Sequence, residues 1–233
     1  MAFRGTDVLS KLQGRLIEPR DGGASWPSEL WTPQEVHRYL HEQQVRVLRE
    51  TGCLISIAWL GLTVPGTTVV DLPEDCLQVV RIGWQRTTDL KHFEIPPADL
   101  FEADMARSGW ITESQSFPIA YSIGEADDVP NQRGDLNRLR LIGSCTDPGI
   151  IEVWYVALPA PLADQGNPVL DAIAAADILT VPDVAMPAVL WGTLEQQTAK
   201  VARGADQPRA SYAREMRTIA IESIQIILRG WEA

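Results

Sequence analysis

The chain has 233 residues, a formal net charge of −11 and an apolar fraction of 45%. This length is enough for one large domain or two modest ones, and the apolar fraction argues against wholesale disorder. No run of about 18 apolar residues is present, so we expect no transmembrane helix. The strongly acidic balance argues against a surface that grips nucleic acid, which requires Lys and Arg on the phosphates.

The N-terminus has neither the apolar core nor the small-residue cleavage site of a secretory signal. We therefore expect a protein of a reducing compartment whose three cysteines, Cys53, Cys76 and Cys145, are free thiols.

A long helix is predicted over residues 32–52. Thr32 can cap its first turn and Gly52 can take the left-handed conformation that ends it. An apolar stripe runs along this helix, and Gln43 and Gln44 interrupt the stripe in its middle. A helix with one apolar face needs a packing partner, and the only comparable helices are predicted about 140 residues downstream.

Three other helices are predicted. Residues 6–17 form a short amphipathic helix, with Lys11 and Arg15 opposite its apolar face. A second helix runs from Asp183 to about Arg203. The last covers about 208–230, and its wide apolar face predicts that it is the most buried of the set. Residues 169–181 are ambiguous between helix and irregular chain.

Short strands and turns fill the middle of the chain. Residues 54–72 predict a hairpin with Pro65–Gly66 at its turn, and residues 98–107 predict one helical excursion. Further strands are expected at 76–84, 90–97, 117–124, 137–143 and 149–158. This rhythm predicts an antiparallel sheet or small sandwich.

The chain is therefore expected to have an α+β fold with a discontinuous α-helical bundle. Residues 1–53 and 165–233 would form the helical domain, built from the N- and C-terminal helices. Residues 54–164 would form the inserted β domain.

No catalytic motif is found, neither a phosphate-binding glycine loop nor a nucleophile elbow. His37 and His41 share a helix face and could bind a metal only if a carboxylate from elsewhere joined them. An enzyme would have to gather these two histidines and a residue such as Glu42 in one pocket. Acidic residues near 125–135 lack the ligand order of a calcium loop. His92 lies in a strand-like segment with no visible partner. We predict no catalytic residue, cofactor or metal.

The order of segments resembles the head-to-tail adaptor proteins of tailed bacteriophages, also called connector or neck-ring proteins, including the tubular tail protein A of short-tailed phages. The most informative segments are DLPEDCLQVVRIG at 71–83 and IEVWYVALPAPL at 151–162. They lie between the long helix and a C-terminal pair of helices, and the resemblance extends from about residue 6 to 228.

The resemblance implies a structural virion protein of the neck or tail that assembles in the host cytoplasm. About twelve copies would form a ring beneath the portal protein, extend the DNA channel used in genome ejection, and dock the next tail component, such as a nozzle or stopper. DNA would pass without specific binding, and no membrane would be involved. The alternative is another neck or tail completion protein, such as a stopper, or a non-catalytic soluble binding module.

Two sets of residues are carried into this hypothesis. The C-terminal helix of such adaptors reaches the portal, and the candidate portal or subunit contacts on it are Tyr212, Met216, Ile227, Arg229 and Trp231. The net charge suggests an acidic channel wall that does not hold phosphates, and the candidate lumen residues are Glu125, Asp127 and Asp128.

Overall fold

The computed structural model describes residues 8, 11–12, 14–15, 33–63, 69–99, 105, 114–123, 138–159, 180–200 and 206–231. The chain divides into two compact units, one made of residues 1–54 and 158–233 and the other of residues 55–157. Helices from both ends of the chain and antiparallel sheets from its middle confirm the predicted α+β fold class.

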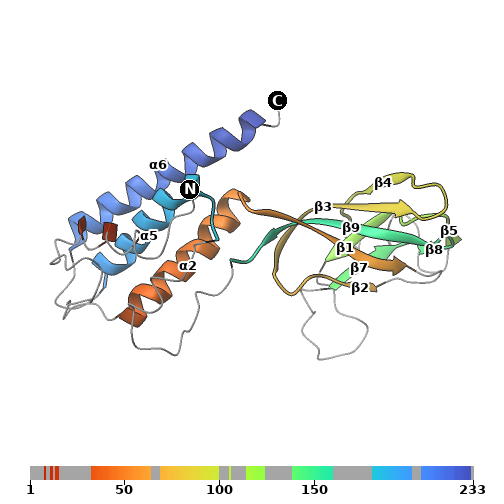
Figure 1. Ribbon diagram of the computed structural model, residues 1–233, viewed down its shortest axis with the longest axis horizontal. Coiled ribbons are helices and arrows are strands. Elements are labelled where there is room, and N and C mark those ends of the chain that lie inside the picture. Colours follow the sequence, from red (N-terminus) through yellow and green to blue (C-terminus); the bar gives the residue numbers. More distant parts are fainter. Residues whose placement is uncertain are drawn as a thin grey trace. The chain divides into compact units, whose positions relative to one another are not determined.

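The helical unit is built on three α-helices, α2 (Pro33–Thr51), α5 (Met186–Thr198) and α6 (Gln207–Trp231), and a 3-10 turn, η1 (Asp183–Ala185), precedes α5. Figure 1 shows α5 between α2 and α6, and α5 contacts both of them extensively. Residues 8, 11, 12, 14 and 15 are also helical, and the side chains of Val8 and Leu12 are fully buried. The bundle therefore joins segments from opposite ends of the sequence.

The end of α2 follows from local chemistry. Gly52 has a positive φ of 64°, and its amide donates to the carbonyl of Leu48 at 2.7 Å, which closes the last turn. Gln43 and Gln44 do not break the packed stripe, because both are buried at 1% and 0% exposure. They form a polar layer within the helical core.

Among the helices that the structure describes, α5 is the most buried, so the expectation for the C-terminal helix was wrong. Nine of the 13 residues of α5 are buried, whereas α6 leaves Ile219 and Ile226 largely exposed. The reason is position, since α5 packs against two helices and α6 mainly against one. Helix α5 ends at Thr198, before the predicted end near Arg203.

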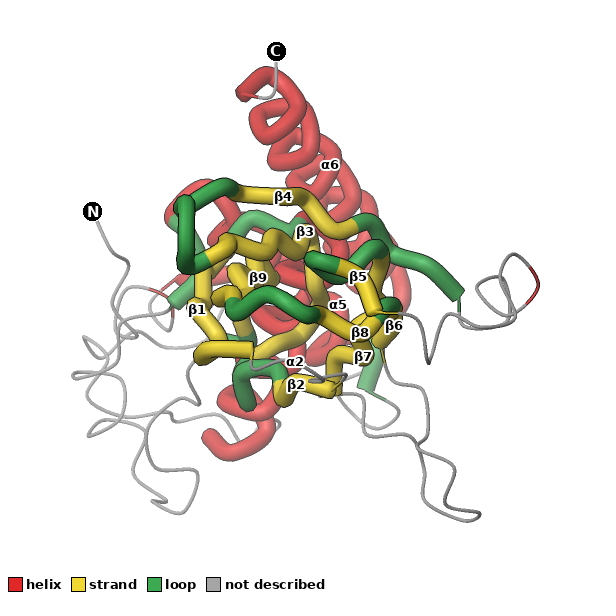
Figure 2. The backbone as a smooth tube through the Cα atoms, turned by 90° about the vertical axis from the view of Figure 1, so that its right-hand side faces the viewer, coloured by secondary structure: helices red, strands yellow, loops and turns green. Residues whose placement is uncertain are grey.

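The β unit contains two antiparallel sheets. Its strands are β1 (Ile55–Thr63), β2 (Val69–Asp71), β3 (Cys76–Arg86), β4 (His92–Ile95), β5 (Ser114–Gln115), β6 (Ala120–Ile123), β7 (Arg138–Ile142), β8 (Ser144–Cys145) and β9 (Gly149–Ala157). Among the described strands, the first sheet has the order β1-β9-β3-β4, the second has β2-β7-β6, and β5 and β8 form a short parallel pair. Figure 2 shows these strands surrounding a common interior.

The predicted hairpin over 54–72 was wrong. Strand β1 pairs with β9, whereas β2 pairs with β7 in the other sheet. The apolar strand β9 is the better partner for β1.

Aromatic rings fill one end of the β core. Trp84 is fully buried, and its ring centroid lies 5.9 Å from that of Phe93 and 6.2 Å from that of Phe117. Gly149 makes room for the indole, since a Cβ at that position would overlap the ring of Trp84. Removal of these large apolar surfaces from water stabilises the unit.

Several predicted segments lie wholly or largely outside the described residues, namely the Pro65–Gly66 turn, residues 169–179 of the ambiguous segment 169–181, and most of 98–107. Within the described part of the chain, no helix has both the length and the apolarity to cross a membrane.

Candidate functional site

The outer side of α6 carries an apolar stripe that nothing in the described chain covers. Tyr212, Ile219 and Ile226 are 56%, 48% and 70% exposed, and their spacing of seven residues places them on one helix face. The half-buried Met216 lies between the first two of them. Exposed aliphatic residues aligned in this way are typical of a protein contact surface.

The opposite side of α6 packs into the helical unit. Ala210, Ala213, Ile221 and Ile224 are buried along it, and Arg217 is buried among them. The amide of Arg209 donates to the carboxylate of Asp206 at 3.1 Å, so Asp206 caps the start of the helix. Both features hold the helix so that its apolar stripe faces solvent.

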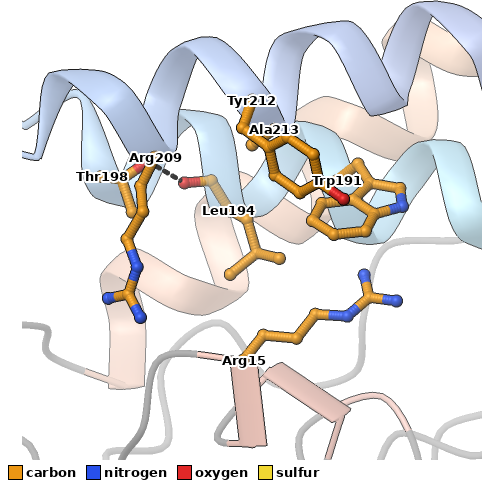
Figure 3. A pocket seen from close by; sticks show the side chains of 7 residues that line it. All are labelled: Arg15, Trp191, Leu194, Thr198, Arg209, Tyr212 and Ala213. Atoms are coloured by element: carbon orange, nitrogen blue, oxygen red, sulfur yellow. Dashed lines mark hydrogen bonds between the residues drawn. The ribbon is translucent and has the colours of Figure 1, made fainter.

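A small cavity of about 170 Å³ lies beside this stripe (Figure 3). Helices α5 and α6 and the N-terminal segment supply its lining residues, which are Arg15, Trp191, Leu194, Thr198, Arg209, Tyr212 and Ala213. Trp191 and Tyr212 meet edge to face, with ring centroids 5.6 Å apart and an interplanar angle of 89°. These rings and Leu194 give the cavity an apolar interior.

The charged groups of this cavity are cations. The guanidinium of Arg15 stacks on Trp191, with Cζ 3.9 Å from the ring centroid. Burial lowers the pKa of Arg15 from its ordinary value. Arg209 forms an exposed ion pair with Asp206 at 3.6 Å, whereas no carboxylate in the described segments forms an ion pair with Arg15.

The candidate contact residues are distributed along α6. Tyr212 and Met216 lie in the first half of the helix, beside the cavity. Ile227, 40% exposed, and the exposed Arg229 lie in its last two turns. Trp231 is the last residue of α6, and its side chain is outside the described residues. The lumen candidates Glu125, Asp127 and Asp128 are also outside the described part of the chain.

A second apolar surface lies on β1, which is an edge strand of the first sheet. Ile55, Ile57 and Trp59 alternate along it and are 49%, 48% and 55% exposed. The alternation shows that they share one face of the sheet. Sequence reasoning recognised the alternation and missed that the apolar side faces solvent.

His92 has a partner, which the sequence did not reveal. Its Nε2 lies 2.6 Å from a carboxylate oxygen of Glu152, and the indole NH of Trp154 donates to the other oxygen at 2.7 Å. Gly83 makes room for the imidazole, because a Cβ there would overlap it. These contacts connect β4 and β9. Because His92 and Glu152 lie 60 residues apart in sequence, no local pattern predicts their contact.

Metal and thiol chemistry have little support in the described residues. No group of three His, Cys, Asp or Glu residues among them could hold a metal ion. The three cysteines are free thiols, and burial raises the pKa of each, that of Cys145 to about 11. Such thiols are poor nucleophiles near neutral pH.

Comparison with known families identified a match that covers most of the chain. The family model described as SU10 adaptor protein matches residues 6–229. Comparison with curated proteins gave no match.

Proposed function

Because the chain belongs to the SU10 adaptor protein family, we propose that this structural phage protein is a head-to-tail adaptor of the virion neck. In this proposal about twelve copies form a ring beneath the portal protein. The ring extends the DNA channel and docks the next tail component, a nozzle or stopper. The subunits assemble in the host cytoplasm, and their role is structural rather than catalytic. The likeness to tubular tail protein A is part of the proposal and rests on the order of segments.

The exposed stripe of α6 is the observation that carries the proposal. Transfer of apolar surface from water stabilises association, by roughly 25 cal/mol for each Å² buried. Ile219 and Ile226 expose about half or more of their surface, so a complex in which a partner covers them is stabilised by this burial. The core of a protein interface is apolar and aromatic, as this stripe is. We assign the stripe, with Met216, Tyr212, Ile227 and Arg229, to a contact with the portal or a neighbouring subunit.

The β1 face offers the second contact that a ring requires. A ring subunit uses two different surfaces, one for each neighbour. The apolar face formed by Ile55, Ile57 and Trp59 is on the other unit of the chain and on an edge strand. An edge strand of nine residues with an exposed apolar face is a hazard for unspecific pairing unless a partner covers it.

Net charge supports the channel role. Each subunit contributes −11, so a ring of subunits has a strongly negative field. An acidic channel wall would let DNA slide because it repels phosphates. We propose Glu125, Asp127 and Asp128 as part of that wall. A ring structure with a channel lined mainly by Lys and Arg would disprove this assignment.

Electron microscopy of the protein mixed with a portal ring of the same phage tests the function. We expect a second ring stacked on the portal, and we expect Ile226→Asp to prevent it, because a carboxylate cannot be buried cheaply at an apolar contact. Thr218→Asp is the matched control, since Thr218 is exposed on α6 away from the stripe. Compact monomers in every mixture would argue for the alternative, a stopper-like completion protein or soluble binding module.

A further inference from the structure

The cavity beside α6 is small. Pockets for small metabolites and drugs usually measure about 300–1,000 Å³. This cavity, at about 170 Å³, lies below that range. It therefore fits an anchoring residue of another protein better than a free ligand.

The walls of the cavity favour an aromatic or aliphatic anchor. Trp191 and Tyr212 present ring surfaces at a right angle, and Leu194 lies between them and Arg209 in Figure 3. The hydroxyl of Thr198 donates to the Leu194 carbonyl at 2.7 Å, so that hydrogen bond is already made within α5. A polar anchor would gain little from such a surface, whereas an apolar one would displace water from it.

Charge selects the residues that flank the anchor. Both charged side chains of the lining, Arg15 and Arg209, are cations, although the chain as a whole carries −11. The guanidinium of Arg15 lies over the Trp191 ring, with Cζ 3.9 Å from the ring centroid, and a guanidinium carries five N–H donors. Arginine pairs with carboxylates through well-directed hydrogen bonds, and a pair beside an apolar pocket is less screened than one in open water.

We propose that this cavity is a docking site for an acidic segment of a partner protein, whose aromatic or aliphatic side chain enters the cavity while an adjacent carboxylate pairs with Arg15. The inference rests on the proposed adaptor function, because it names the chemistry of one contact that α6 makes in the assembled neck. The occupant in this proposal is a segment of another neck protein, whose acidic residues complement the two cations of the lining.

Titration of the full-length chain with blocked peptides tests the proposal. The first probe is Gly-Asp-Glu-Phe-Glu-Asp-Gly, and two controls replace its Phe by Ala or its four acidic residues by Lys. Binding is followed by NMR at peptide concentrations up to about 5 mM. This range detects complexes whose binding free energy is only about 4 kcal/mol. We expect the acidic Phe peptide to bind at least about tenfold more tightly than either control. We also expect its affinity to fall as the salt concentration rises.

Variants assign the binding to the cavity. We expect Arg15→Gln and Tyr212→Ala each to lower the affinity for the acidic Phe peptide by about three- to tenfold. The first variant removes the charge partner of the peptide, and the second removes one wall of the cavity. Arg49→Gln is the control, since Arg49 is an exposed arginine of α2 that does not line the cavity. Equal binding of acidic and basic peptides, or no effect of Arg15→Gln, would overturn the proposal.

Two further measurements separate the possible failures. Analytical ultracentrifugation of the protein alone would overturn the choice of occupant if self-association were found and Arg15→Gln abolished it, because a second copy would then fill the cavity. Microscopy of the portal mixture tests the adaptor function independently of the peptides. Stacked rings with no peptide preference would refute only the cavity, and peptide binding without rings would refute only the adaptor.

Discussion

Arg217 of α6 donates from Nη2 to both carboxylate oxygens of Glu50 at the end of α2, at 2.8 Å each. The arginine side chain is only 7% exposed and the glutamate side chain 33%. The side-chain amide of Gln225 also donates from Nε2 to the backbone carbonyl of Glu50, at 3.2 Å. This pair joins the N-terminal and C-terminal parts of the helical unit.

Removal of the Glu50 charge should destabilise the protein. Glu50→Gln would leave the buried guanidinium of Arg217 without its counterion, and we expect a loss of about 1–3 kcal/mol in the free energy of unfolding. Urea unfolding followed by circular dichroism measures this loss. Glu222→Gln, an exposed change on α6, should stay within about 0.5 kcal/mol, and an equal effect of the two variants would show that the ion pair contributes nothing.

The same pair should make stability depend on pH. Burial by itself raises the pKa of Glu50, but hydrogen bonds and charge from Arg217 and Arg46 outweigh burial and leave this pKa below its ordinary value. The contribution is therefore complete above the unfolded pKa of about 4.3 and is lost as the pH falls through the lower folded pKa. The stability difference between the native chain and Glu50→Gln should shrink below about pH 4. A constant difference from pH 7 to pH 3 would contradict the assignment.

Deletion of residues 208–233 should unfold the helical unit and leave the β unit folded. The deletion removes the buried Ala210, Ala213, Ile221 and Ile224, and α5 loses its main packing partner. We expect the helical signal in circular dichroism to fall by more than the share of α6, while the near-ultraviolet signal of the buried Trp84 remains. A truncated chain that keeps the helical signal of α2 and α5 would refute the expectation.

Gly149 should tolerate no side chain. A Cβ there would overlap the buried indole of Trp84, so Gly149→Ala should cost about 1–3 kcal/mol through overpacking. Gly61→Ala is the matched change, because Gly61 lies in β1 of the same sheet and a Cβ there meets nothing within 4 Å. Thermal unfolding of both variants measures the difference. Similar melting temperatures for the two would mean that the indole can move aside.

The sequence predicted the features that are encoded locally. Gly52 ends α2 as its left-handed conformation requires, and short runs bounded by turn residues identified β1 and most other strands. Contacts between distant segments were not predictable in this way. His92 and Glu152 are 60 residues apart, and the stacking of Arg15 on Trp191 joins the two ends of the chain. Such partners depend on which elements pack together, which no spacing rule specifies.

The same limit explains the errors about α6 and β1. A wide apolar face on α6 predicts burial, but the fold buries only one side of that helix and leaves Ile226 in solvent. In β1 the apolar alternation predicts a sheet face without saying which face meets the core. Hydrophobicity in the sequence therefore indicates burial by some partner, and the partner need not belong to the same chain.

The pairing of Ile55 with Val156 has a consequence for folding. These residues lie where the chain enters and leaves the β unit, so formation of that unit brings the ends of an insertion of 103 residues side by side. The chain that connects α2 to α5 is then effectively shortened, because the inserted β unit brings its own two ends together. Between α2 and η1 the chain runs over residues 52–182, and bridging the 103-residue insertion leaves about 28 of them, which is about two halvings of length. Each halving lowers the entropic cost of closure by about 0.6 kcal/mol, so the saving is roughly 1.2 kcal/mol. If the β unit folds first, it therefore shortens the effective loop between the N-terminal and C-terminal helices. These helices can then associate at a lower entropic cost.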